Sequence, residues 1–531
     1  MLICLSMIAS AFVSTSLNYE ISHDESHLYP APVESKKLDI NNISTWFRTN
    51  GSFNRDPATG NEGFEWSKGL GTYAVYASGL WIGAKVEQDT LVCLAEFDYE
   101  YLPGYIDNNG VPQGKDDPAY RIYSIIRGDT VSPDYLNWPA NQGAYLNENG
   151  KPFFLGTQTM FYSHTDGYPE AHQNNAGSTA PLKVQILQTN WAYTNLNLRD
   201  VAFTEFKIIN RSNKVWSKTY LAIWTDAIIG DANDNAVGCD TNLSLTYTYN
   251  SDNNDPIYGL APPAMGFLIL RNPVSPSPGD TAKYFDPPGS NNLLVKPDHR
   301  EVRLSAFNMF YNADPVNGDP SNYKETYRNL QGLRRTGLPW INPLTNQPTT
   351  FAFSGDPVSG TGWIDGNSGQ RRSMTCLGPL TVIPNDTQSV IFAQVIARGS
   401  SNINSIAKLR ELSVYVKSIY QNNFQNVLSS NVASTKLPDE FTLHQNYPNP
   451  FNPTTHIRYE LPVAGGVNIA IYDITGKEIS RPVSGYMPPG NHEIEFDASG
   501  LPGGVYFCRM EVESGTNGTI LTKSIKLLFL K

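Results

Sequence analysis

Apolar and polar residues alternate along the C-terminal part of the chain, residues 441–531. Ile457, Tyr459 and Leu461 are separated by single polar residues, and the same period of two runs from Tyr506 to Val512. This period is typical of a strand that buries one face. Glycine pairs at 465–466 and 503–504 separate such segments as turns. Several short strands with this spacing predict a small Ig-like β-sandwich.

The long region before it, residues 38–425, also follows strand patterns. Runs rich in β-branched and aromatic residues predict strands at 73–85, 90–97, 182–187, 201–209, 219–224 and 390–397. Residues 271–300 are rich in Pro, Asp and Gly, and they mark either a long insertion or a boundary between two domains. The predicted fold is therefore all-β, with one or two β-sandwich domains and long loops in 38–425, followed by the C-terminal sandwich.

One segment of this region has the period of a helix. Ile406, Leu409, Val416 and Ile419 recur at steps of three and four residues or their multiples, and the pattern continues to Phe424. Ser405 is positioned to cap the first turn. We expect an amphipathic helix that packs on the sandwich.

The segments before and between these two regions are not predicted to form a folded core. Leu2 to Val13 is an apolar run of signal-peptide length, so residues 1–16 are predicted to be a signal peptide, although no Lys or Arg precedes Lys36. Residues 17–37 are polar and are predicted to be disordered, and 426–440 are predicted to be a linker. We expect no transmembrane segment in the mature chain, because no other apolar run is long enough to span a bilayer.

Composition narrows the class of protein. The chain has 531 residues, 40% of them hydrophobic, and a net charge of −11, which argues against a nucleic-acid partner. The five cysteines are too few for a disulfide scaffold, and no CxxC pair is present. Disulfide pairing and oligomeric state stay open at this point.

The C-terminal region contains four ordered blocks: the entry motif from 447 to 455, a strand that ends at Tyr472, a Gly-rich block, and the Lys-rich strand from 523 to 531. The motif residues are Tyr447, Pro448, Asn449, Pro450, Phe451, Asn452, Pro453, Asp473, Gly476, Gly500, Leu501, Gly504 and Tyr506. With these blocks, the region resembles the type A C-terminal sorting domain of the type IX (Por) secretion system. Cys508 departs from the pattern of the family.

This resemblance implies where the protein is transported and does not imply a reaction or a ligand. It implies that the type IX machinery is a partner of the chain and that the chain passes through the periplasm to the outer surface or the medium. Segments at 225–263 and 371–399 are similar to uncharacterised secreted proteins that carry the same sorting domain. Those proteins suggest architecture and location only.

The strongest candidate for a metal site is an Asp-rich segment that follows a predicted strand. Asp226, Asp231, Asp234 and Asp240 fall within fifteen residues, with Gly230 between them. Hard oxygen ligands in a flexible loop suit Ca²⁺, and clustered carboxylates repel one another without a cation. The segment therefore predicts a structural Ca²⁺ site, with a solvated acidic loop as the alternative.

Signatures of catalysis are weak. The chain has no HExxH, Walker A or GxSxG motif. His164, Asp166 and His172 are interpreted as surface-loop residues, and Glu96 to Glu100 as one face of a strand. Four tryptophans are candidates to stack on sugar rings but are more readily explained as core, namely Trp66, Trp81, Trp138 and Trp340.

Two classes of function remain. The first is a secreted or cell-surface binding or structural protein with a polysaccharide or protein ligand, which fits the absence of a catalytic motif. The second is an extracellular hydrolase acting on polysaccharide or protein, because its paired carboxylates need no motif. The sequence favours the first and leaves the ligand unidentified.

Overall fold

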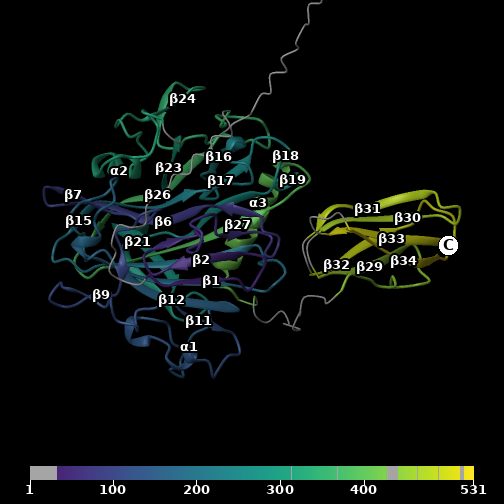
Figure 1. The fold of residues 1–531 in the computed structure, drawn as a ribbon, viewed down its shortest axis with the longest axis horizontal. Coiled ribbons are helices and arrows are strands. Elements are labelled where there is room, and N and C mark those ends of the chain that lie inside the picture. Colours follow the sequence, from purple (N-terminus) through teal and green to yellow (C-terminus); the bar gives the residue numbers. More distant parts are fainter. Residues whose placement is uncertain are drawn as a thin grey trace, which may run out of the picture.

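The structure, a computed structural model, describes residues 33–311, 314–366, 369–425, 427, 440–462, 465–487, 490–514 and 519–531. The predicted signal peptide lies outside these residues, as do most of the segment 17–37 and of the linker 426–440. Strands dominate the described chain, as predicted (Figure 1). The fold is all-β.

The central region contains two large antiparallel sheets. The first has ten strands, of which eight follow the order β23-β26-β15-β6-β3-β2-β4-β5, while β1 pairs with β2 and β7 with β6. Their bounds are β1 Ser35–Leu38, β2 Ser44–Arg48, β3 Ser52–Phe53, β4 Phe64–Glu65, β5 Tyr73–Val75, β6 Ala77–Val86, β7 Asp89–Cys93, β15 Trp216–Asp226, β23 Leu304–Tyr311 and β26 Arg371–Val382.

The second sheet has nine strands, of which eight follow the order β11-β12-β13-β14-β27-β20-β17-β16, while β8 pairs with β12. Their bounds are β8 Leu102–Pro103, β11 Tyr123–Ile126, β12 Gln158–Thr165, β13 Val184–Ala192, β14 Val201–Asn210, β16 Asn235–Asp240, β17 Leu245–Asn250, β20 Ala264–Arg271 and β27 Thr387–Ala397. The strands predicted near 182, 201, 219 and 390 are confirmed as β13, β14, β15 and β27.

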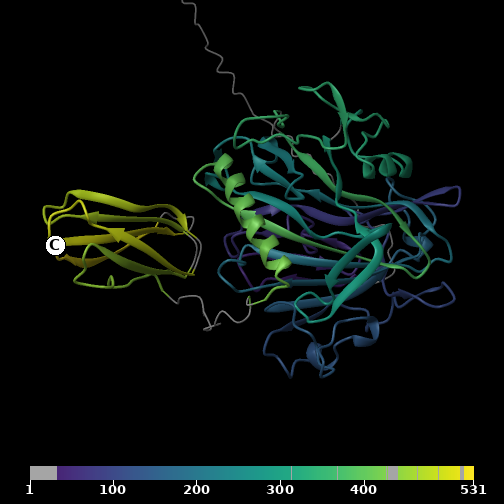
Figure 2. The ribbon, with the colours of Figure 1, turned by 180° about the vertical axis from the view of Figure 1, so that it is seen from behind.

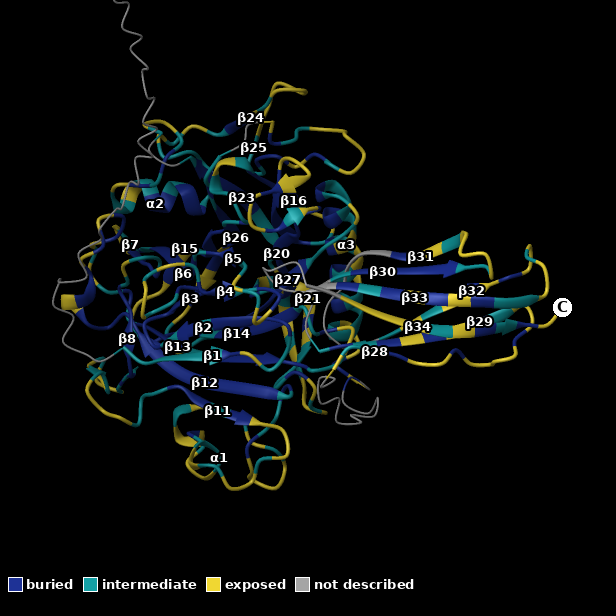
Figure 3. Cartoon of the chain, turned by 45° about the vertical axis from the view of Figure 1, so that its right-hand side comes forward, coloured by how far each residue is buried: buried dark blue, intermediate teal, exposed yellow. Residues whose placement is uncertain are grey.

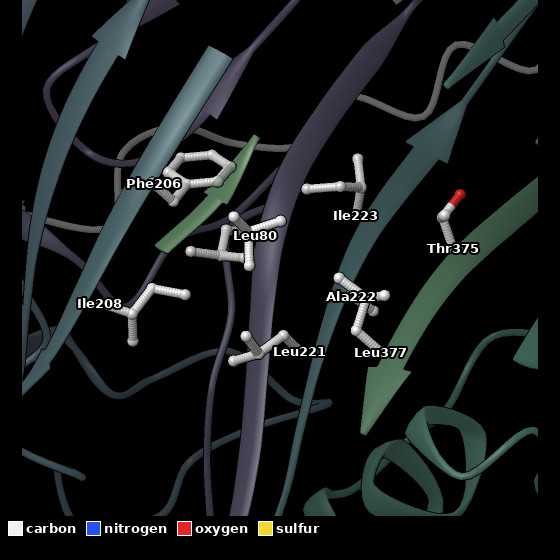
Figure 4. Close-up of a pocket in the computed structure, with 9 residues that line it drawn as sticks. Leu80, Phe206, Ile208, Leu221, Ala222, Ile223, Thr375 and Leu377 are labelled. Atoms are coloured by element: carbon white, nitrogen blue, oxygen red, sulfur yellow. The ribbon is translucent and has the colours of Figure 1, made fainter. Parts of the chain in front are cut away.

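The two sheets pack face to face. Phe47 and Leu80 of the first sheet lie in one buried cluster with Phe206, Phe267 and Phe392 of the second. Figure 4 shows apolar side chains of both sheets around a gap of about 10 Å³, too small and too apolar to hold a ligand. Figure 3 shows the same core as the buried strands in the middle of the central region.

Short elements cover the outer faces of both sheets. The helix α2 (Tyr323–Leu330) packs on Trp81 and Trp224 of the first sheet. The helix α3 (Asn402–Gln421) lies across the second sheet, where Ile406, Leu409 and Val416 are buried (Figure 2). The remaining helical pieces are α1 Pro133–Leu136 and the 3₁₀ turns η1 Ala140–Gln142, η2 Pro169–Ala171 and η3 Ala232–Asp234.

The predicted helix is present, but it begins earlier than expected. Ser401 caps it, with its side chain accepting from the backbone N–H of Asn404 at 3.0 Å. Ser405 lies inside the helix and donates instead to the carbonyl of Pro262 at 2.8 Å. The expected cap at Ser405 is therefore wrong, because Ser405 lies one turn inside the helix and its hydroxyl binds the loop before β20.

Residues 271–300 form a long exposed hairpin of β21 (Val274–Phe285) and β22 (Leu293–Glu301). The strands before and after it, β20 and β23, belong to the second and the first large sheet, respectively. The hairpin therefore connects the two sheets. The other small ribbons are β9 Tyr105–Ile106 with β10 Pro112–Gln113, β18 Asn254–Asp255 with β19 Gly259–Leu260, and β24 Trp340–Asn342 with β25 Gln347–Thr349.

The C-terminal region forms a small β domain of two sheets. One has the order β28-β29-β32 and the other β31-β30-β33-β34. Tyr459, Phe496 and Tyr506 lie in the core between them. The strands are β28 Thr442–Leu443, β29 Thr454–Leu461, β30 Gly465–Tyr472, β31 Glu478–Met487, β32 Gly490–Asp497, β33 Gly504–Ser514 and β34 Thr519–Phe529.

Candidate functional site

The structure places Asp226 and Asp240 in separate surroundings and keeps Asp231 and Asp234 together at one turn. Asp226 ends β15 and is buried, and its Oδ2 lies 3.1 Å from the Nε of Arg372. Asp240 ends β16, and its Oδ2 lies 3.4 Å from the Nε of Arg410 on α3. Each of these two carboxylates therefore has a guanidinium beside it from a distant part of the chain.

Asp231 caps the turn η3, and Asp234 is the last residue of that turn. The Asp231 carboxylate accepts from the backbone N–H of Asn233 at 2.9 Å. Burial, followed by the nearby Asp255 and Asp231 carboxylates, raises the pKa of Asp234 to about 6. In the described part of the chain, no three His, Cys, Asp or Glu side chains converge as metal ligands. Structural Ca²⁺ stays a prediction.

Asp226 belongs instead to a cluster of carboxylates around one guanidinium. Arg372 also contacts Asp319 and lies 5.1 Å from the ring centre of Phe97. Glu96 accepts a hydrogen bond from the side chain of Asn174 at 2.8 Å. Burial, with a smaller contribution from the Asp319 carboxylate, raises the pKa of Glu96 to about 7 and that of Asp226 to about 6.

The local backbone of this cluster differs from the expectation. The strand predicted at 90–97 ends at Cys93, and residues 94–101 form a tight turn in which Ala95 pairs with Tyr99. Glu96 and Glu100 consequently do not line one face of a strand. Glu96 faces the Arg372 cluster, whereas Glu100 is fully buried elsewhere.

A second polar cluster surrounds His172. Its ring nitrogens lie 3.7 Å from carboxylate oxygens of Glu100 and of Asp166. Asp166 accepts backbone hydrogen bonds from Leu182 and Val184 at 2.6 and 2.7 Å. The surface-loop interpretation of His164, Asp166 and His172 is therefore wrong, because all three are buried between strands.

This cluster makes stability depend on pH. Burial, and then the Asp166 carboxylate, raises the pKa of Glu100 from 4.5 to about 8. The stability that Glu100 contributes is therefore full below about pH 4.5 and is lost as the pH rises through about 8. Glu100→Gln should weaken the fall in the urea midpoint between about pH 5 and about pH 9.

The exposed Glu148→Gln variant is the control and should keep the wild-type profile. His164 acts in the opposite direction, since burial lowers its pKa to about 3, so its contribution is lost only as the pH falls below its ordinary 6.5. An unchanged slope in Glu100→Gln above pH 7 would contradict the assignment.

The tryptophans proposed for stacking on sugars belong mainly to the core. Trp66, Trp81 and Trp340 are buried, while Trp138 is half-buried and donates to the carbonyl of Tyr145 at 3.0 Å. The core interpretation is therefore confirmed for the first three. The half-buried rings of Phe153 and Phe154 and the buried rings of Tyr193 and Phe424 form an aromatic pocket that the sequence did not predict.

These aromatic rings line a surface pocket of about 290 Å³. Its walls come from five separate segments: the turn after β11, the loop before β12, the end of β13, the β21–β22 turn and the end of α3. The residues that carry the argument are Arg127, Asn147, Phe153, Phe154, Tyr193 and Phe424. Because these segments are far apart in sequence, no local motif could have identified the pocket.

The pocket combines apolar faces with one cation. The rings of Tyr193 and Phe424 stack with centres 6.0 Å apart. The guanidinium of Arg127 lies 5.5 Å from the ring centre of Phe154 and donates to the carbonyl of Gly156 at 3.3 Å. Burial lowers the pKa of Arg127 from its ordinary value, which shows that the guanidinium is partly removed from water.

In the C-terminal domain, the entry motif lies against the last strand. Phe451 exchanges backbone hydrogen bonds with Leu528 and Leu530, at 3.0 and 2.9 Å, and its ring stacks on Phe529. Asn449 accepts from the backbone N–H of Leu528 at 2.9 Å. Tyr447 is 81% exposed. The motif thus has both a structural part and a displayed part.

The other motif residues form turns. Asp473 accepts from the backbone N–H groups of Thr475 and Lys477, and Gly476 has a φ of 82°, which only glycine adopts without strain. Tyr506 donates to the carbonyl of Pro502 at 2.7 Å. Cys508, which departs from the family pattern, is a buried thiol in the core of the domain.

The class that this architecture defines is an exported all-β protein with an appended C-terminal β domain. Residues 445–526 match a family described as the secretion system C-terminal sorting domain. The chain is therefore cargo of the type IX secretion system, and that machinery is its partner. It travels through the periplasm to the outer cell surface or the medium.

Comparison with other known proteins adds little about the central region. No curated protein matches the chain. A polysaccharide lyase is similar with 9% identity and a TM-score of 0.25, over 94% of this chain and 46% of the lyase. Dimeric latent PorU from Porphyromonas gingivalis is similar with 10% identity and a TM-score of 0.15, over 70% of this chain and 31% of PorU.

This chain thus spans less than half the length of either protein, and likenesses this low carry no argument about its activity. In the described residues, no helix is both long and apolar enough to cross a membrane.

Proposed function

We propose that the central region binds an extracellular polysaccharide after type IX export. The observation that carries this proposal is the aromatic pocket with Arg127 at its side. Flat aromatic rings favour the apolar faces of sugar rings, and a guanidinium supplies several fixed donors for hydroxyl or carboxylate oxygens.

The size and surroundings of the pocket support the same proposal. Its volume of about 290 Å³ suits one or a few sugar units rather than a folded partner. Ile126 and Leu146, the sequence neighbours of two lining residues, are 49% and 42% exposed. These two side chains are exposed apolar groups close in sequence to the pocket.

The test measures retention and product release together for the full chain against a panel of polysaccharides and proteins. Phe154→Ala and Phe153→Ala should each weaken retention by about tenfold, because each removes one stacking face. Phe507→Ala truncates an exposed ring of the C-terminal domain and is the matched control. Equal retention by all three variants would reject the pocket as the binding site.

The alternative function, an extracellular hydrolase, is favoured by a different observation. Glu96 and Asp226 both have raised pKa values and both interact with Arg372, and such pairs are common in acid–base sites. If the panel shows product release, Glu96→Gln should abolish turnover and leave retention unchanged. Retention without product supports the binding protein.

A further inference from the structure

A cluster of four polar side chains joins the β21–β22 hairpin to the second sheet. Lys207 and Glu205 project from the same face of β14, two residues apart. Asp286 follows the last residue of β21, and its Oδ2 lies 2.9 Å from the Nζ of Lys207. Tyr145 lies beneath the amine, with its ring centre 4.5 Å from Nζ.

The tyrosine hydroxyl contacts two carboxyl groups at once. Its oxygen lies 2.8 Å from Oε2 of Glu205 and 2.5 Å from Oδ1 of Asp286. A phenol carries one proton, so it donates to only one of them. The second contact is a hydrogen bond only if one carboxyl group itself carries a proton.

The surroundings of Glu205 decide which group that is. Its other oxygen, Oε1, receives the guanidinium of Arg271 at 2.8 Å and the hydroxyl of Ser389 at 2.7 Å. These donors stabilise an ionised Glu205. Asp286 receives no guanidinium among these contacts, and the ammonium of Lys207 lies on its opposite oxygen, where it can supply the proton that the reaction needs.

We propose that Lys207 and Asp286 are joined by an amide bond in the folded protein. Transfer of one proton leaves a neutral amine beside a neutral carboxylic acid, which are the reactive forms. The amine nitrogen attacks Cγ of Asp286, and the bond from Cγ to its hydroxyl oxygen then breaks.

The atoms balance without any other reactant. Of the three protons of the ammonium group, one stays on the amide nitrogen and two leave as water with one carboxylate oxygen. Tyr145 and Glu205 are positioning residues that hold the acid and relay a proton to the departing oxygen. The reacting groups are held in contact, and their side chains are only 19% and 18% exposed, so water competes poorly.

The bond would act as a covalent staple. It connects positions 79 residues apart and fixes the exposed hairpin to a central strand. Cys93, Cys239, Cys376 and Cys508 are all free thiols, so no disulfide takes this role in the described chain. The inference does not depend on the ligand of the pocket.

Mass spectrometry of the full chain tests the proposal. After a cooperative melt has confirmed folding, the denatured and reduced chain should weigh one water less than its sequence. A digest should contain one peptide pair joined through Lys207 and Asp286. A chain with the full mass of its sequence would overturn the proposal. Loss of one water without that peptide pair would show dehydration at another site and would also overturn it.

Three variants and two internal controls sharpen the result. Lys207→Arg keeps the charge but should lose the linked pair completely, and Asp286→Ala should do the same. Tyr145→Phe keeps the ring and removes the hydroxyl, so the linked fraction should fall at least several-fold while the melt stays cooperative. Wild-type linkage in Tyr145→Phe would overturn the relay.

Two other ion pairs of similar length serve as the internal controls. Lys36–Asp134, at 3.0 Å, and Lys214–Glu87, at 2.7 Å, should give no linked peptides. Linkage at these pairs as well would show that proximity alone is sufficient and would remove the special role of Tyr145.

Discussion

Deleting residues 441–531 will leave the protein in the periplasm. The sorting domain is the part of the chain that matches the type IX family, so its removal takes away the address while the core of the central region stays intact. We expect a nearly complete loss of surface and extracellular protein. Cell fractionation followed by immunoblotting of each fraction measures it.

Two point variants test whether export requires the sorting domain to be folded. Phe451→Ala removes a buried ring that packs on Phe529 and should destabilise the domain by about 3–5 kcal/mol, with a matching loss of export. Ile474→Ala truncates a side chain that is 75% exposed and should be exported normally. Unchanged extracellular yield after the deletion would refute the sorting role.

Arg271→Ala will cost about 3–5 kcal/mol of unfolding free energy. Arg271 and Glu205 form an ion pair at 2.8 Å with side chains that are 3% and 1% exposed. Removing the guanidinium leaves the carboxylate buried with no cation to offset the loss of water. Urea unfolding of the wild type and the variant gives the difference directly.

The matched control is Lys214→Ala. Lys214 pairs with Glu87 at 2.7 Å, but the side chains are 47% and 63% exposed, so its loss should cost less than about 1 kcal/mol. A similarly small cost for Arg271→Ala would mean that Glu205 is stabilised by Ser389 and Tyr145 without the guanidinium.

Local patterns predicted most of the secondary structure. The apolar and aromatic residues of 201–209 and the apolar run in 390–397 predicted β14 and β27, because strands buried in a sheet are rich in such residues. The helix at 402–421 followed from its apolar period. Its cap was misplaced by one turn, since both Ser401 and Ser405 fit the pattern of capping residues.

Polar residues were harder to place, because their partners lie far away in sequence. Asp226 was interpreted together with Asp231 as a ligand of one ion, yet its partner Arg372 lies 146 residues later. Asp166 was placed on the surface, although it accepts hydrogen bonds from the start of the next strand. The residues next to Asp226 and Asp166 in sequence give no signal of either contact.

The order of strands also limits when the chain can fold. The central partners of β14 and β15 are β27 and β26, which lie in the last part of the central region. During export from the N-terminus onward, the first sheet is not complete until residues near 382 have emerged, and the second not until residues near 397. Until then, unpaired strand edges of the emerging chain are exposed. The incompletely folded chain is therefore prone to aggregate while it is in the periplasm.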